Sequence, residues 1–171
     1  MQHLLNTLVM ATLFAVSSAT TLLAEELVLP PKPDPHRFSV KVPRFKGFIG
    51  MFNTSVVRYN DGHMEVFYGF IFGNPKRDGL IFVVNDITGT ECEGETSRQP
   101  DKSGKGEMRC TTQGALTSVS PVEIATGTYG KLKGVDTGMV LDPEGIQIGS
   151  ILTRWNGWDF PDATEMSESF P

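Results

Sequence analysis

Residues 60–72 read Asn-Asp-Gly-His-Met-Glu-Val-Phe-Tyr-Gly-Phe-Ile-Phe, a tight-turn signal followed by alternating side chains. An Asn-Asp-Gly turn beside apolar segments predicts a β-hairpin. On the strand expected after it, one face carries Met64, Val66, Tyr68, Phe70 and Phe72, and the other carries His63, Glu65, Phe67, Gly69 and Ile71. The second face turns apolar halfway along, which predicts that the far half of the strand is covered on both sides.

Further strands are expected on either side of this hairpin. Apolar side chains recur at every second position over residues 38–42, as on a half-buried strand. Residues 80–84 form a short apolar run typical of a central strand. Pro121 suits an edge or a bulge of a further strand. The turn Asp142–Gly145 has the residues of a type I turn and predicts a second hairpin. No segment after residue 38 shows a sustained helical period. The sequence therefore predicts an all-β domain of about eight strands over residues 38–160, either an antiparallel barrel or a sandwich.

The N-terminal segment has the pattern of an export signal. Residues 1–24 contain no Asp, Glu, Lys or Arg and have an apolar centre at residues 8–16. Small residues before the end predict cleavage after Ala19 or after Ala24. The alternative is an uncleaved anchor, since residues 4–23 would just reach across a bilayer. A Pro-rich extended spacer is expected over residues 25–37, and a flexible acidic tail over residues 161–171.

The two cysteines, Cys92 and Cys110, are expected to form a structural disulfide. Their spacing differs from the Cys-x-x-Cys of redox-active pairs, and with three scattered histidines they do not make a zinc pattern. The polar residues 93–106 between them are expected to form an exposed loop. A disulfide and an export signal together indicate a periplasmic or secreted protein.

Charge and composition exclude some functions. The chain has 171 residues and a formal net charge of −5, which is the wrong sign for a nucleic-acid partner. Metal ligands on one face of a strand lie at every second position, and Asp61, His63 and Glu65 have this spacing. Because Asp61 belongs to the predicted turn, no metal site is expected. No cofactor is expected either. Acids such as Asp136 and Asp142 are expected to be solvated, and Asn53-Thr54-Ser55 is a glycosylation sequon.

Residues 126–134, Thr-Gly-Thr-Tyr-Gly-Lys-Leu-Lys-Gly, followed by Gly138, resemble a motif of the dirigent and allene-oxide-cyclase-like barrels. The pieces around Cys92 and Cys110 are similar to small uncharacterised proteins of the bacterial envelope. The first resemblance implies a secreted antiparallel β-barrel with a glycine-rich strand–turn–strand passage. It carries over no catalytic residue, so the catalytic residues stay unknown.

These observations predict an exported, non-catalytic β module that binds a protein partner or a small apolar ligand. The candidate pocket residues, if a lumen exists, are His63, Glu65, Phe67, Tyr68, Phe70 and Phe72. One alternative is a small barrel enzyme of the lyase or isomerase type, with His63 or Glu65 as proton carrier. Another is a membrane-tethered structural subunit, which requires the N-terminal segment to stay attached.

Overall fold

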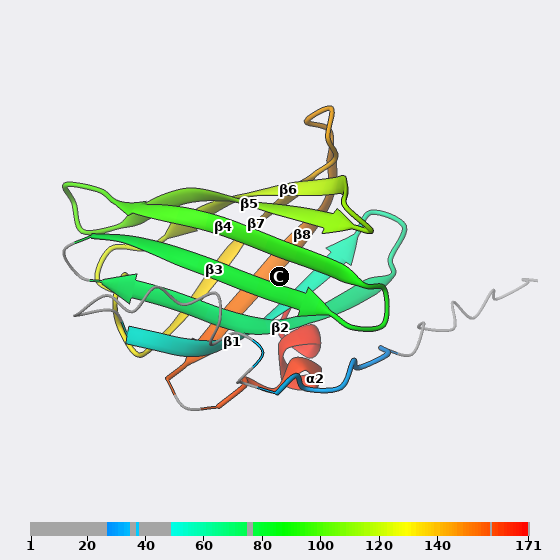
Figure 1. Cartoon of the computed structure of the whole chain (residues 1–171), viewed down its shortest axis with the longest axis horizontal. Helices are drawn as coiled ribbons and strands as arrows, with labels where there is room; N and C mark the ends of the chain where they lie inside the picture. The colour runs from blue at the N-terminus through cyan, green and yellow to red at the C-terminus, as the bar shows by residue number, and fades with distance from the viewer. Residues whose placement is uncertain (1–26, 35–36, 38–48, 75–76, 158, 171) are drawn as a thin grey trace, which may run out of the picture.

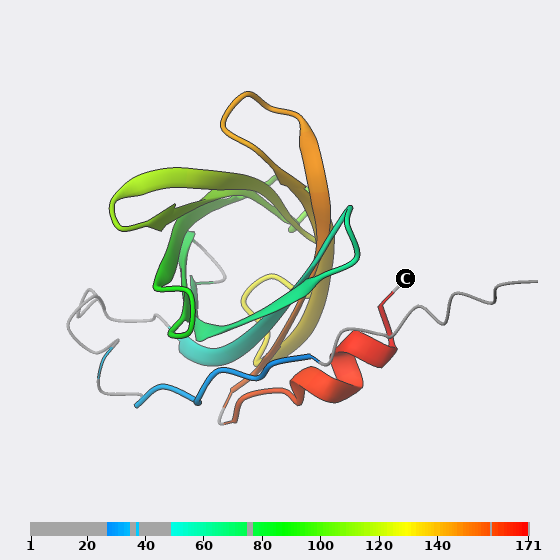
Figure 2. The same cartoon turned by 90° about the vertical axis from the view of Figure 1, so that its right-hand side faces the viewer.

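The protein is a closed antiparallel β-barrel of eight strands with one short helix outside it (Figures 1 and 2). The computed structural model describes residues 27–34, 37, 49–74, 77–157 and 159–170. Each strand pairs with the next along the chain, and β8 closes the ring against β1. The strands are β1 Ile49–Tyr59, β2 Met64–Asn74, β3 Arg77–Asn85, β4 Thr90–Arg98, β5 Gly104–Thr112, β6 Ala115–Ile124, β7 Lys133–Leu141 and β8 Gln147–Asn156. The prediction of an all-β domain with about eight strands is confirmed, and the choice between barrel and sandwich is settled as barrel.

Both predicted hairpins are present. Between β1 and β2, Gly62 has a φ of 96° and its N–H donates to the Tyr59 carbonyl at 3.0 Å. Between β7 and β8, the Gly145 N–H donates to the Asp142 carbonyl at 3.0 Å, while the Asp142 side chain accepts from the Ile146 N–H at 2.8 Å. The turn residues therefore fix the register of these two strand pairs, as their sequence predicts.

The segment between the two cysteines is a strand pair and not the exposed loop expected from its polarity. β4 and β5 cover most of it, and only the short turn around Lys102 connects them. Most outward positions are charged and most inward ones are small, so hydrophobic alternation is faint in the sequence. Gly94 and Gly106 explain the close packing, because a Cβ there would lie 2.5 Å and 1.9 Å from carbonyl oxygens of the neighbouring strand.

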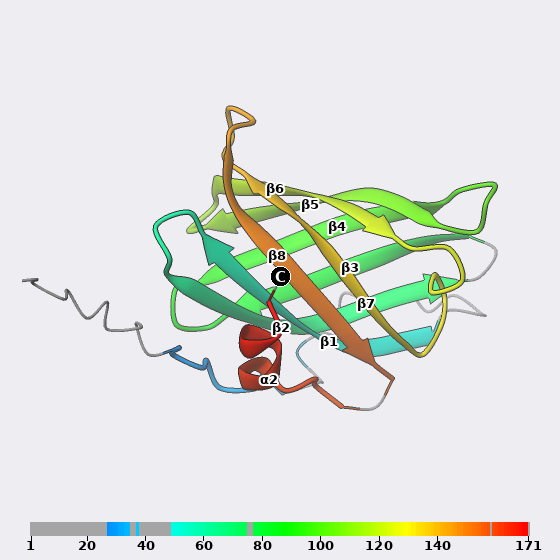
Figure 3. The same ribbon diagram turned by 180° about the vertical axis from the view of Figure 1, so that it is seen from behind.

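Two apolar clusters lie on opposite sides of the barrel wall. The inner cluster fills the barrel and takes side chains from all eight strands, including Phe67 and Trp155. The outer cluster lies between the barrel and helix α2, Ala163–Glu168, whose Met166 is fully buried. Figures 1 and 3 show α2 packed beside β1 and β2. Burial of Met166 is the main apolar contribution of this helix to stability.

The C-terminal segment predicted as a flexible tail contains helix α2. Asp162 caps the helix by accepting from the Glu165 N–H at 2.9 Å, which satisfies one of the free N–H groups of the first turn. The acidic residues face solvent, while Ala163 and Met166 face the barrel. A single apolar pair in a short acidic segment is too weak a pattern to predict a helix, since its stability comes from docking.

The N-terminal predictions lie largely outside the described residues. The predicted signal segment and its cleavage sites fall before residue 27. In the Pro-rich part, residues 27–34 form neither helix nor strand, and Leu27 packs against the outer cluster. Arg37 forms ion pairs with Asp86 at 2.5 Å and Glu91 at 3.2 Å, so this segment also contacts the turn between β3 and β4.

Candidate functional site

The structure separates the aromatic residues of the predicted pocket. Phe67 points into the barrel and belongs to the inner cluster. Tyr68, Phe70 and Phe72 lie on the opposite face of β2, outside the barrel, because side chains alternate along a strand. There the Tyr68 ring lies 5.2 Å from that of Phe160, and other rings of this face pair as Phe52–Phe70 and Phe72–Phe82. These residues therefore do not line a common pocket.

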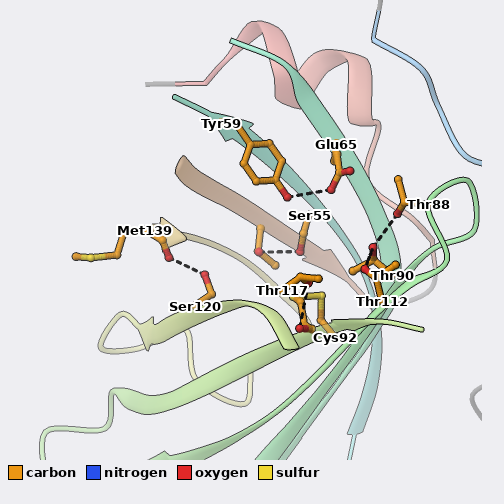
Figure 4. The surroundings of a disulfide bond; sticks show 12 residues. Ser55, Tyr59, Glu65, Thr88, Thr90, Cys92, Thr112, Thr117, Ser120 and Met139 are labelled. Carbon is orange, nitrogen blue, oxygen red and sulfur yellow. Dashed lines mark hydrogen bonds between the residues drawn. A yellow bond between two sulfur atoms is a disulfide. The ribbon is translucent and has the colours of Figure 1, made fainter. Parts of the chain in front are cut away.

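His63 and Glu65 lie near the β1–β2 turn, on either side of Tyr59. The His63 ring stacks on the Tyr59 ring with centroids 4.2 Å apart, and its Nδ1 lies 2.5 Å from the Asp61 carboxylate. Glu65 accepts from the Tyr59 hydroxyl at 3.0 Å (Figure 4). Burial, reinforced by the Glu65 charge, raises the pKa of Tyr59 well above its usual value. Within the described residues, no group of three or more metal-ligating side chains is found.

The interior of the barrel is filled by side chains. Cavities of about 20 Å³ and about 10 Å³ lie between the described side chains. The smaller is lined by Phe67, Cys92, Cys110 and neighbouring apolar residues, and Figure 4 shows the disulfide surroundings. A cavity of about 10–15 Å³ holds one water molecule. Neither of these cavities therefore has room for an apolar ligand unless the barrel opens.

Asn53 is fully buried within the barrel wall, and neither atom of its amide has a hydrogen-bond partner among the described residues. The adjacent inward residue on β1, Ser55, is satisfied, since its hydroxyl lies 2.8 Å from that of Thr153. The glycosylation sequon is therefore inside strand β1. A glycan on Asn53 is incompatible with the folded barrel.

Replacing Asn53 by leucine is expected to stabilise the protein by about 1–3 kcal/mol, because a buried amide without partners carries an uncompensated desolvation cost. Urea unfolding measures the change. Ser55→Ala is the matched control on the same face of β1, and it should destabilise by about 1 kcal/mol, since it leaves Thr153 without its partner. A loss of stability in Asn53→Leu would show that the amide is satisfied in solution.

The described barrel wall is interrupted between β6 and β7. These strands share one paired position, Val119 opposite Leu141, whereas β7 pairs with β8 along its whole length. Figure 3 shows β7 running beside β8 while β6 stays with β5. We name the region between residues 121–124 of β6 and residues 133–139 of β7 the β6–β7 seam.

Pro121 explains where the pairing stops. Extending the register from Val119 and Leu141 places Pro121 opposite Met139. Proline has no N–H to donate to the Met139 carbonyl. That carbonyl instead accepts from the Ser120 hydroxyl at 2.6 Å (Figure 4). The sequence prediction that Pro121 suits an edge or a bulge is consistent with this geometry.

Asp136 lies beside the next position of the missing ladder. The same register places Glu123 opposite Thr137. The main-chain N–H groups of both residues interact with the Asp136 carboxylate and partly offset the rise of its pKa. Asp136 also borders the larger interior cavity. Burial, with a smaller contribution from the Glu123 charge, raises the pKa of Asp136 to about 6.

A cleft of about 490 Å³ opens over this seam on the outside of the barrel. Its wall includes Asp101, Lys105, Glu123, Val135 and Asp136. Lys105 lies 3.3 Å from Glu123, and both side chains are largely exposed. Asp136 makes no ion pair with any described residue. The cleft thus combines a partly buried carboxylate, further acids and an exposed apolar residue, an arrangement that can hold a cation or exchange a proton.

Sequence reasoning does not single out Asp136 and expects it to be solvated. Its strand alternates in an unusual way, with Val135 and Met139 exposed and Gly134, Asp136 and Gly138 on the inward side. Because Val135 and Met139 face outward and Val140 is the apolar residue buried inside, the hydrophobic pattern points the wrong way for most of this strand. Two sequence features together mark this site: Pro121 interrupts one strand, and the acidic residue Asp136 lies on the glycine-rich face of the next strand.

The Asp136 pKa predicts a pH-dependent stability. Since folding raises this pKa from its usual 3.8 to about 6, the folded state binds the proton more tightly than the unfolded state. This contribution to stability is fully present below pH 3.8 and is lost as the pH rises through 6. Asp136→Asn should therefore gain stability relative to the wild type between pH 4 and pH 7, measured by urea unfolding at each pH.

Asp101→Asn is the control of opposite sign. The side chain of Asp101 accepts from the Ser103 hydroxyl and N–H at 2.6 Å and 2.9 Å, which lowers its pKa. Its replacement should lose stability relative to the wild type as the pH rises through the acid range. An Asp136→Asn variant whose stability follows the wild type at every pH would contradict the burial of this carboxylate.

The glycine-rich passage that resembles the dirigent and allene-oxide-cyclase-like barrels forms the β6–β7 loop and the first part of β7. Gly127 and Gly130 have positive φ angles of 86° and 73°. Gly134 lies beneath the Trp155 ring, where a Cβ would come within 2.0 Å of the ring. The passage therefore has the turns and the close approach that its glycines predict.

Comparisons with known proteins leave the family open. No protein-family model, no curated protein and no solved structure matches the chain. In the part of the chain that the structure describes, no helix is long and apolar enough to cross a membrane. The barrel and its β6–β7 seam are therefore the features that bear on function.

Proposed function

We propose that this protein is an exported, non-catalytic β-barrel that binds a protein partner at the β6–β7 seam. The observation that carries the proposal is the interrupted pairing of β6 and β7 beneath an open cleft of about 490 Å³. Strand edges left without a neighbour are common sites of protein recognition. The disulfide between Cys92 and Cys110 supports an oxidising compartment, periplasmic or extracellular.

A protein partner is favoured over the small apolar ligand. The interior cavities are about 20 Å³ and 10 Å³, far below the few hundred Å³ of ordinary ligand pockets. A screen of apolar ligands at saturating concentration should therefore leave the thermal midpoint unchanged. A ligand that raises the midpoint would restore the alternative.

Binding is also favoured over catalysis. Asp136 is the described acid that borders both the cleft and the interior, whereas His63 and Glu65 lie near the β1–β2 turn. Among the described side chains, none is hydrogen-bonded to Asp136 as a second member of a catalytic pair.

The tethered-subunit alternative depends on the N-terminal segment, and the intact mass of the exported protein tests it. Loss of 19 or 24 residues would exclude a tether.

Site-specific photo-crosslinking tests the proposal directly. A photoreactive amino acid replaces Val135, which is 49% exposed at the cleft, and in a second variant replaces Ile146, which is 64% exposed at the β7–β8 turn. In the native envelope or medium, the Val135 position should crosslink to one defined protein and the Ile146 position should not. A partner that crosslinks equally at both positions, or only at the control, would overturn the seam as the binding surface.

A further inference from the structure

We infer that residues 133–135 of β7 bind the protein partner by β-strand addition, with an extended segment of the partner as the next strand of the barrel wall. We call these three residues the β7 edge. The inference rests on the proposed function and specifies how the partner binds. Two independent observations carry it: the direction of the main-chain groups on β7, and the location of the exposed apolar side chains on the described strands.

The main-chain groups of Val135 point away from β8. The Met139 carbonyl faces β6, since it accepts from the Ser120 hydroxyl at 2.6 Å. Main-chain groups alternate in direction along a strand, and the pairing of β7 with β8 is unbroken from residue 133 to residue 139. The N–H and the carbonyl of Val135, four residues before Met139, therefore face the seam as well.

Strand β6 ends before it reaches the β7 edge. The β6–β7 register would place Ala125 opposite Val135, but β6 ends at Ile124. The Ala125 carbonyl belongs to a turn, where it accepts from the Thr128 N–H at 3.1 Å and from the Thr128 hydroxyl at 2.6 Å. The main-chain donor and acceptor of Val135 therefore have no described strand beside them, which is the arrangement that accepts an added strand.

The exposed apolar side chains of the described strands gather on β7. Val135 and Met139 are 49% and 45% exposed, whereas the other large apolar side chains described on the strands are buried or half-buried. Cross-strand apolar pairs stabilise neighbouring strands, so an added strand with apolar residues on its outer face would cover Val135. The same strand that has a free edge thus also has the side chain that a neighbour would bury.

The two faces of β7 specify the alternation of the partner segment. A strand added antiparallel to β7 places every second side chain beside Val135 on the outside, and the side chains between them beside Gly134 on the inside. The Trp155 ring lies against Gly134 and borders an inner cavity of only about 20 Å³. The inward residues of the partner segment must therefore be small, whereas the outward ones are apolar. The cleft of about 490 Å³ that Val135 lines has room for such a segment.

Three acetylated, amidated pentapeptides test this mode of binding. The first is Ser-Val-Ser-Val-Ser, the second carries N-methyl groups on both valines, and the third carries them on the central and last serines. Valines placed on the outer face direct their N–H groups to β7, so NMR titration should show at least about tenfold weaker binding of the second peptide than of the first. The third peptide loses N–H groups that point away from β7, so it should bind as tightly as the first.

Amide hydrogen exchange reports on the β7 edge itself. In the free protein the Val135 N–H should exchange rapidly, whereas the Asp136 N–H, which faces β8 opposite Thr153, should be protected. The first peptide should slow the exchange of Val135 and leave that of Asp136 unchanged. Val135→Ser should weaken binding of this peptide about threefold to tenfold through lost apolar contact, and Ile146→Ser, at the β7–β8 turn, should not.

Slow exchange of the Val135 N–H in the free monomer, failure of the first peptide to bind, or equal weakening by both methylation patterns would overturn the inference. Protection of Val135 that rises with protein concentration alone would assign the β7 edge to a second copy of this chain, and would overturn its assignment to a separate partner. A partner crosslinked at Val135 alongside any of these failures would leave the proposed function standing. Absence of that crosslink would contradict the proposed function itself.

Discussion

Replacing Cys92 and Cys110 together by alanine is expected to lower the free energy of unfolding by about 3 kcal/mol. The two residues lie directly opposite each other on β4 and β5, and the bond closes a loop with a sequence separation of 18. Both side chains are buried, at 3% and 6% exposure, so alanine avoids placing a new polar group in the interior. For a domain of this size, such a loss is a large part of the total stability.

Urea unfolding with and without reductant measures this contribution. Reductant should destabilise the wild type by an amount close to the effect of the double substitution. The double-alanine variant is its own control, because reductant should not change its unfolding. Wild-type stability that is the same in both conditions, with the bridge shown by mass to be reduced, would mean that the β4–β5 pairing alone holds this part of the barrel.

The sequence predicts this fold best where residues close together along the chain determine the local structure. The turns at Gly62 and Gly145 need specific residues at fixed positions, so both hairpins were predictable. Strand β4 and the beginning of β5 were missed because their inward positions include Cys92, Gly94 and Gly106, which are small and contribute little hydrophobic alternation. Their strand character depends on neighbours that pack closely against them.

The candidate site was less predictable than the fold because it depends on pairing between strands. Pro121 indicates an interruption but not which neighbour loses its hydrogen bonds. Asp136 becomes distinctive only when the register brings it beside Glu123 and Thr137. The aromatic residues of β2 show the reverse problem. Their number suggested a ligand pocket, although strand alternation places Tyr68, Phe70 and Phe72 outside the barrel.

Replacing Trp155 by alanine is expected to destabilise the protein by about 3–5 kcal/mol. The side chain is 4% exposed, belongs to the inner cluster and borders the larger interior cavity beside Asp136. Its Nε1 donates to the Lys131 carbonyl at 3.1 Å, which ties the β6–β7 loop to β8. The substitution therefore removes apolar burial and leaves the loop carbonyl without this donor. Urea unfolding, with Trp155→Phe as the variant that keeps most of the ring volume, separates the two contributions.

Gly134 provides an independent test of the same packing. A Cβ on this residue would lie 2.0 Å from the Trp155 ring, so Gly134→Ala should cost about 1–3 kcal/mol in the wild type. In a Trp155→Ala background the ring is gone, and the same substitution should cost much less. The double-mutant cycle should therefore show a coupling of at least about 1 kcal/mol between the two positions. Additive effects would contradict the placement of the Trp155 ring over Gly134, and with it the structural reason for the glycine at the start of β7.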